Sequence, residues 1–337
     1  MKPSPWRRLL PLLKLLATVG LIGLLWYQGK LDFSTLMLIS SSPGTILLVI
    51  GASMIGYSLV AVRWVLLLHS QHIPLPFAWG HRVTYLGLYC NLVLPGGGMA
   101  GDALRLAHAI RAAPTHRLEA LLSLFVDRAV GLYAMLLIAM LAIFVNPHLV
   151  MGIGPLQLMA VAVIAAVFGI PLSVLIFYLL VNRVRETPWF VRFLQSGRVG
   201  RLTGRLVEII RLYHHAWPRL LLALGITLVC QMLLLWALVL VANGLSMGTL
   251  TPGEYTFATP WAWIANFLPL TPGGIGVGEA AFDQVCRWIE TTPSGAPYGT
   301  IFLVFRLLTM LGTFPGLVIF FFSRKEVQEA IGQRDPA

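Results

Sequence analysis

The sequence predicts an all-α polytopic membrane protein with six spanning helices and two glycine-broken re-entrant hairpins. The 337-residue chain is 58% hydrophobic and only 11% charged, which is typical of a chain that crosses a bilayer several times. Six apolar segments are long enough to cross about 30 Å of hydrocarbon at about 1.5 Å per residue. One short glycine-rich motif occurs twice, each time after apolar sequence of helical length. We expect one transmembrane domain over residues 1–324 and a cytoplasmic tail over residues 325–337.

The first apolar segment follows Lys2, Arg7 and Arg8 and therefore resembles a signal peptide. Its length, the interrupting Lys14 and the lack of a small-residue cleavage site favour a retained signal-anchor helix. Five further apolar segments follow it along the chain. The six predicted spans are about Leu9–Gln28, Gly44–Leu68, Leu118–Val145, Leu156–Val181, Trp217–Ala242 and Tyr298–Ser323.

The duplicated motif reads P-G-G-G-M-A-G-D over residues 95–102 and P-G-G-I-G-V-G-E over residues 272–279. Proline ends a helix because it lacks an N–H and clashes with the preceding turn, and glycine lets the backbone approach a ligand closely. The next helix then presents unpaired N–H groups and a positive dipole end, which bind phosphate or carboxylate. Glycines that only permit close helix packing are the structural alternative, but two copies with an acid at the same spacing favour a binding function. The motif positions predicted to bind substrate are Pro95, Gly96, Gly97, Pro272, Gly273, Gly274 and Gly276.

Loop charge decides how the broken stretches 79–111 and 255–290 lie in the membrane. If each enters and returns on one side, Arg111, Arg117 and the arginines of 182–216 share a side with the basic N-terminus. If each crossed the membrane, these arginines would lie outside, against the positive-inside rule. We therefore predict re-entrant hairpins, cytoplasmic termini and a basic cytoplasmic connector over 182–216. This connector is either an interfacial helix on the anionic leaflet or a solvated linker.

The same topology gives each half of the chain two spans, one hairpin and one further span. Three crossings per half place the halves, about 9–145 and 156–323, in opposite orientations, with the hairpins entering from opposite sides. An inverted repeat with two broken helices meeting near the midplane is the arrangement expected of an alternating-access carrier.

In the first half, charged residues at membrane depth are the candidate substrate ligands. Asp102 lies in the first turn after the motif, where it either caps the helix or supplies a counter-charge. Arg105 lies three residues later on the same face and can pair with it. Asp127 and Arg128 are adjacent, so their side chains point about 100° apart and different partners are expected. Arg63 is placed near the cytoplasmic interface, where snorkelling accounts for its charge.

In the second half, Glu279 is the acid of the motif, and Asp283 shares its helical face. Arg306 lies well inside the last span, where a charge is costly unless paired, so we expect it to be functional and to pair with one of these acids. Asn91 and Asn266 precede the two breaks and can bind freed backbone groups or ligand oxygens, with the backbone role favoured.

Catalytic and metal-binding patterns are missing from the sequence. The histidines lack metal-ligand spacing, and no H-E-x-x-H, nucleophile elbow or Walker loop occurs. The net charge of +11 lies mostly in short segments between apolar runs, which indicates lipid-surface contact and orientation rather than nucleic-acid binding. We expect no cofactor, no bound metal and no enzymatic activity.

Three stretches carry a family resemblance: N-L-V-L-P-G-G-G-M-A-G-D-A-L-R from residue 91, D-R-A-V-G from residue 127 and F-L-P-L-T-P-G-G-I-G-V-G-E-A-A-F from residue 267. The chain resembles the lysylphosphatidylglycerol synthase transmembrane family, also called the flippase-like integral membrane domain. The resemblance implies a multi-pass protein of the bacterial inner membrane that moves aminoacylated phosphatidylglycerol, a glycosylated lipid carrier or a hopanoid. We expect a stand-alone member without the soluble aminoacyl-transferase domain of the synthases, and Ala100 stands where a second glycine is expected. By resemblance, the family's patterned positions are Asp102, Arg105, Asp127, Arg128, Pro272, Gly273, Gly274, Gly276 and Glu279.

The sequence thus predicts a lipid flippase-like transporter for a phospholipid or lipid-linked headgroup. An anionic or zwitterionic headgroup would place its phosphate at the helix N-termini and at Arg105, Arg128 or Arg306, with the acyl chains in the bilayer. Two alternatives stay open: a membrane enzyme or accessory subunit acting on a lipid-linked sugar, with the acids as general bases, and a secondary carrier for a small anion. Membrane lipids are the expected partners, nucleic acid is not, and homo-oligomer formation stays open.

Overall fold

The computed structural model describes residues 42–93, 98–184, 216–245, 250–267 and 275–322, together with residues 39–40 and a few single positions. All regular secondary structure in these ranges is helical. The predicted first span, most of the 182–216 connector and the tail lie outside the described residues. So do the motif residues Pro95, Gly96, Gly97, Pro272, Gly273 and Gly274.

Five helical segments in the described part are long and apolar enough to cross a membrane, which confirms the polytopic all-α fold. Large apolar side chains such as Leu158, Phe168 and Trp236 are exposed on them, as expected for surfaces that face lipid. The segments are α2 (Pro43–Ser70), α5 (Arg117–Val145), α6 (Gly154–Val184), α9 (Trp217–Leu245) and the pair α12 (Tyr298–Leu311) and α13 (Phe314–Phe322).

The last span is interrupted, whereas the sequence analysis treated Tyr298–Ser323 as one helix. α12 ends at Leu311 and α13 begins at Phe314, because Pro315 has no N–H to bond the carbonyl of Leu311 and its ring clashes with that group. Glycines beside the break also allow close packing. A Cβ on Gly312 would overlap Ser53 of α2, and a Cβ on Gly316 would overlap the backbone carbonyl of Tyr85.

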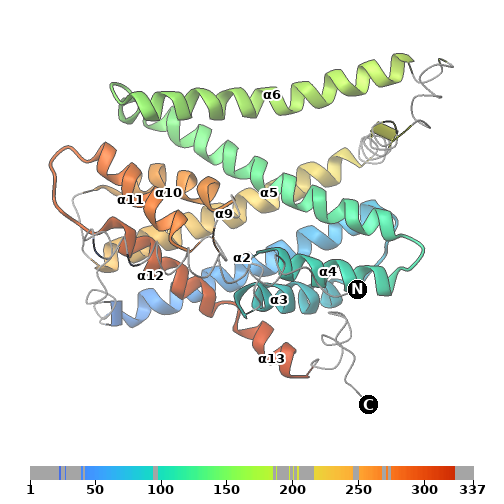
Figure 1. Ribbon diagram of the computed structural model, residues 1–337. Coiled ribbons are helices and arrows are strands. Elements are labelled where there is room, and N and C mark those ends of the chain that lie inside the picture. Colours follow the sequence, from blue (N-terminus) through green and yellow to red (C-terminus); the bar gives the residue numbers. More distant parts are fainter. Residues whose placement is uncertain are drawn as a thin grey trace, which may run out of the picture.

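The two glycine-broken stretches form helical hairpins, as predicted. The first consists of α3 (Phe77–Val93) and α4 (Gly98–Ala112), and the second of α10 (Pro252–Phe267) and α11 (Val277–Ile289). The two helices of each hairpin pack against each other. Figure 1 shows that the first hairpin enters from the end of the bundle where α2 ends and α5 begins, and the second from the opposite end. This arrangement is the one that an inverted repeat requires.

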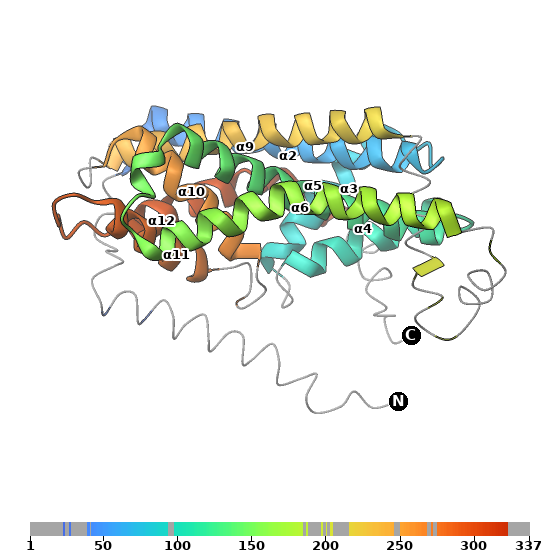
Figure 2. The same cartoon turned by 90° about the horizontal axis from the view of Figure 1, so that it is seen from above.

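The remaining helices surround the hairpins. α2 and α9 lie side by side along the bundle (Figure 2), and α6 packs mainly on α5 and forms an outer edge (Figure 1). The core of the second half is aromatic: the ring centroids of Phe282 and Phe302 lie 5.3 Å apart, and those of Phe302 and Phe305 lie 5.9 Å apart. This aromatic packing joins α11 to α12.

Membrane orientation gives the first testable prediction. Thr115 lies exposed in the loop between α4 and α5, and Thr292 lies exposed between α11 and α12, at the other end of the bundle. By loop charge, Thr115→Cys should react with an impermeant maleimide only after the inner face is opened. Thr292→Cys should react from the outer face. The three native cysteines are buried and provide a low background. Labelling of both positions from one side would contradict the hairpin arrangement.

Candidate functional site

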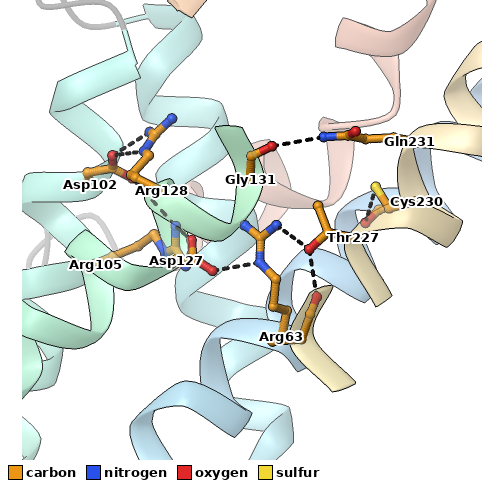
Figure 3. A network of polar contacts seen from close by, with 11 residues as sticks. Arg63, Asp102, Arg105, Asp127, Arg128, Gly131, Thr227, Cys230 and Gln231 are labelled. Carbon is orange, nitrogen blue, oxygen red and sulfur yellow. Dashed lines mark hydrogen bonds and ion pairs between the residues drawn. The ribbon is translucent and has the colours of Figure 1, made fainter. Parts of the chain in front are cut away.

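A polar cavity of about 320 Å³ lies between α2, α3, α4 and α5 of the first half and α9 of the second half. Five charged side chains line it, and Figure 3 shows them converging from α2, α4 and α5. They are Arg63, Asp102, Arg105, Asp127 and Arg128.

Asp127 is the centre of the charge network. Its Oδ1 accepts a hydrogen bond from Arg63 Nε at 2.7 Å, and its Oδ2 lies 3.3 Å from both terminal nitrogens of Arg105. The side chains of Asp127, Arg63 and Arg105 are only 2%, 8% and 7% exposed. Arg63 Nη1 also donates to Thr227 Oγ1 of α9 at 2.9 Å. The expectation that Arg63 snorkels to the interface is therefore wrong: it is buried, and it pairs with a carboxylate because an unpaired buried charge is costly.

Asp102 and Arg128 form a second, more accessible pair. Arg128 Nε donates to Asp102 Oδ2 at 2.6 Å, and the Arg128 side chain is 46% exposed. Asp102 also lies 3.4 Å from Arg105, which confirms the predicted pair at three-residue spacing. Asp127 and Arg128 do have different principal partners, as expected from their adjacent positions.

The cavity lining has an excess of positive charge and several unsatisfied polar atoms. Three arginines face two aspartates there, which leaves one formal positive charge. Thr84 Oγ1, Arg105 Nε and Gln231 Oε1 are buried and have no hydrogen-bond partner among the described residues. Because burying an unsatisfied polar group costs about 1–3 kcal/mol, these three atoms require further partners, which water or a polar ligand would supply.

Glycine and asparagine bring the hairpin helices together behind this cavity. The backbone N–H of Gly101 donates to Asn91 Oδ1 at 2.6 Å, which confirms the predicted backbone role of Asn91. A Cβ on Gly101 would overlap the carbonyl of Gly87, so α3 and α4 touch through their backbones. Gly101 therefore serves close helix packing, and this packing places Asp102 and Arg105 at the cavity.

The second motif builds a separate, closed cluster. Arg306 Nε lies 2.7 Å from Glu279 Oε1, and the two side chains are 10% and 1% exposed, which confirms the predicted pair. Glu279 Oε2 accepts the backbone N–H of Gly276 at 2.7 Å, so this acid also caps α11. Gly276 has a φ of +88°, in the left-handed region that favours glycine. Asn266 accepts a hydrogen bond from Arg306 Nη2 at 3.2 Å, so its described bond goes to a side chain rather than to the backbone as expected.

Asp283 lies apart from both clusters. Its carboxylate binds Arg287 Nε at 2.8 Å, and Arg287 Nη2 donates to the carbonyl of Ala296, which fixes the loop before α12. The same loop is held at Glu290, which accepts hydrogen bonds from Ser294 and Tyr298. Partial burial raises the pKa of Glu290, but these hydrogen bonds outweigh it and hold that pKa below its ordinary value. Asp283 thus has a structural position and does not line the polar cavity.

The structure therefore divides the predicted site residues. Asn91, Asp102, Arg105, Asp127 and Arg128 line the cavity together, whereas the described residues of the second motif do not line it. Several other residues that line the cavity are not predicted by the sequence motifs. In the sequence, these residues differ from their surroundings only as polar side chains within an apolar span or hairpin. They are Tyr57, Arg63, Thr84, Thr227 and Gln231.

Local geometry nevertheless repeats between the halves. The acid of each motif pairs with an arginine of the following span, 26 residues later in Asp102–Arg128 and 27 residues later in Glu279–Arg306. The glycine before each acid packs against the asparagine of the preceding helix. Within the described ranges, no three His, Cys, Asp or Glu side chains gather as a metal site.

The Glu279–Arg306 pair yields a stability prediction. Glu279→Gln leaves buried Arg306 without its counter-charge, so we expect a loss of about 3–5 kcal/mol in the free energy of unfolding. Arg306→Gln should cost a similar amount, and the double variant should be no less stable than either single one. Thermal unfolding in detergent measures all three. Additive losses would show that the two side chains act independently.

Residues 12–316 match a family model described as the lysylphosphatidylglycerol synthase TM region. The matched range covers both hairpins and every residue that lines the polar cavity. A search of the curated proteins found no match.

Proposed function

Because the chain belongs to the lysylphosphatidylglycerol synthase transmembrane family, a membrane family with members implicated in lipid flipping, we propose that it moves lipid headgroups between leaflets. The cargo is a phospholipid or a lipid-linked headgroup, and the membrane is the bacterial inner membrane. The observation that carries this proposal is the polar cavity with its positive excess and its three unsatisfied buried atoms.

The phosphate of the headgroup is the anion that this lining suits. Arg128 is half-exposed, Arg105 and Thr84 also line the cavity, and Arg105 Nε and the Thr84 hydroxyl are donors without a partner among the described residues. A phosphate oxygen accepts several such charge-assisted bonds at once. Asp102 pairs with Arg128, and the incoming phosphate takes its place.

Gln231 adds a requirement for the rest of the headgroup. Its amide nitrogen donates to the carbonyl of Gly131 at 3.2 Å, which leaves Oε1 as an acceptor that needs a donor. A headgroup that carries a hydroxyl or an ammonium group next to the phosphate supplies that donor. Such a headgroup is anionic with hydroxyls, or zwitterionic.

The hairpin arrangement supports a transport function. Two hairpins that enter from opposite ends let opposite halves of the protein open the cavity in turn. When phosphate replaces Asp102 as the partner of Arg128, the contact between α4 and α5 is released. Binding of the headgroup in the cavity is thereby coupled to the position of α4.

The proposal assigns no catalytic chemistry to this site. Arginines engage both carboxylates of the cavity, so neither is positioned as a proton acceptor for a substrate. A carrier for a small free anion remains the second candidate, because the same arginines would bind inorganic phosphate.

Reconstitution into liposomes of defined composition separates these functions. Fluorescent phosphatidylglycerol or phosphatidylethanolamine should become accessible to a membrane-impermeant quencher faster than in protein-free liposomes. Inorganic phosphate uptake should stay at the background rate. Uptake of phosphate without lipid movement would establish the small-anion carrier, and turnover of a lipid-linked sugar without movement would establish the enzyme.

A further inference from the structure

A second cavity, apolar and of about 500 Å³, lies between α5, α6, α10 and α11. Its volume is within the range of about 300–1,000 Å³ typical of ligand sites. The side chains that line it are apolar except for Gln284 of α11. Its walls include Leu136 of α5, Val163 of α6, Trp261 of α10 and Val285 of α11.

The apolar cavity adjoins the polar one. Leu132 of α5 and Phe267 of α10 line both cavities, so these two side chains form a shared wall. Arg128, Leu132 and Leu136 follow one another at four-residue steps and lie on one face of α5. Over the eight residue steps from Arg128 to Leu136, about 12 Å along the helix, the lining changes from a guanidinium group to aliphatic side chains.

We propose that the apolar cavity holds one acyl chain of the lipid whose headgroup occupies the polar cavity. This proposal rests on the proposed function and deepens it. A ligand that fills both cavities is charged at one end and aliphatic at the other, which describes a glycerophospholipid and excludes a free anion. The acyl chain enters the cavity from the bilayer beside α6, where Ala162 lines the cavity and is exposed. Under this proposal one acyl chain lies in the cavity and the other stays in the bilayer, whereas the sequence predicts that both stay in the bilayer.

A photoreactive lipid tests this placement. Phosphatidylglycerol with a diazirine in one acyl chain is reconstituted with the whole protein, irradiated and mapped by mass spectrometry. We expect adducts on cavity residues of α6 and α11, Ala162 and Gln284 among them. Ala162→Trp fills the cavity and should lower the adduct yield on α11 at least about tenfold, which corresponds to about 1.4 kcal/mol.

Ala165→Trp is the matched control, because Ala165 is also an exposed alanine of α6 but does not line the cavity. It should leave the adduct yield unchanged. Equal yields in the two variants, or adducts confined to the exposed faces of α6, would overturn the acyl-chain site.

Lipid movement measured on the same samples separates this proposal from the proposed function. Movement that persists without adducts in the cavity overturns the acyl-chain site alone. Adducts that are sensitive to Ala162→Trp, in a protein that moves no lipid, establish the binding site and overturn the transport function. Absence of both signals overturns both.

Discussion

Asp127→Asn is expected to lower the free energy of unfolding by about 3–5 kcal/mol, enough to remove most of the folded protein. The substitution removes the negative charge between Arg63 and Arg105, both buried, while keeping the shape of the side chain. Thermal unfolding in detergent and the yield of monodisperse protein measure the effect.

Two companion variants make this test specific. Glu119→Gln changes a partly exposed acid of the same helix and should alter stability by about 0.5 kcal/mol or less. Asp127→Asn combined with Arg63→Gln should be less destabilised than the sum of the two single changes, because they share one interaction. Stability within about 0.5 kcal/mol of the parent in Asp127→Asn would show that the network does not hold the bundle together.

Arg128→Gln is expected to reduce lipid movement by about tenfold to a hundredfold with little loss of stability. A hydrogen bond from a charged donor to phosphate contributes about 1.5–3 kcal/mol, which corresponds to this range of rates. Stability should change little because Arg128 is 46% exposed, and accessible ion pairs contribute about 1 kcal/mol or less. Quencher accessibility in liposomes measures the rate.

Arg128→Lys and Arg117→Gln complete this experiment. Lysine keeps the charge but not the planar pair of donors, so partial activity is expected. Arg117 is an exposed arginine at the start of the same helix and lies outside the cavity, so its replacement should leave transport unchanged. Wild-type rates in Arg128→Gln would remove Arg128 from the substrate site.

Sequence patterns were sufficient for the hairpins and for pairs within or near one motif. Proline and glycine interrupt α3–α4 and α10–α11 by local chemistry, and Arg306 inside an apolar span required an acid nearby. The burial of Arg63 inside the bundle could not be predicted from such local patterns. Its partner Asp127 lies 64 residues away on another helix, and hydropathy does not tell which face of α2 meets α5. Pro315 interrupts the last span, and a proline at this position is a local signal that the apolar character of the segment conceals.

The division of the two motifs into separate clusters has a reason in the neighbouring residues. Arg105 stands three residues after Asp102, but Phe282 stands three residues after Glu279. Asp127 precedes Arg128, but Phe305 precedes Arg306. Phe282 and Phe305 both contact Phe302, so aromatic rings fill the second half where charges surround a cavity in the first. The two halves therefore differ in charge because of residues outside the repeated motif.

The backbone contacts of the first hairpin determine which parts of the chain can move together. Gly87 and Gly101 hold α3 against α4, and Gly316 holds α13 against Tyr85 of α3, so none of these three helices can slide without a backbone clash. Close backbone contacts therefore link Asp102 on α4 to the last described helix through α3. The break before Pro315 then lies where a hinge would be needed, at the junction between these three helices and α12. A bulky residue at Gly316 is therefore expected to displace α3 and, through α3, to shift Asp102 on α4. Gly316 lies far from the charged side chains in sequence.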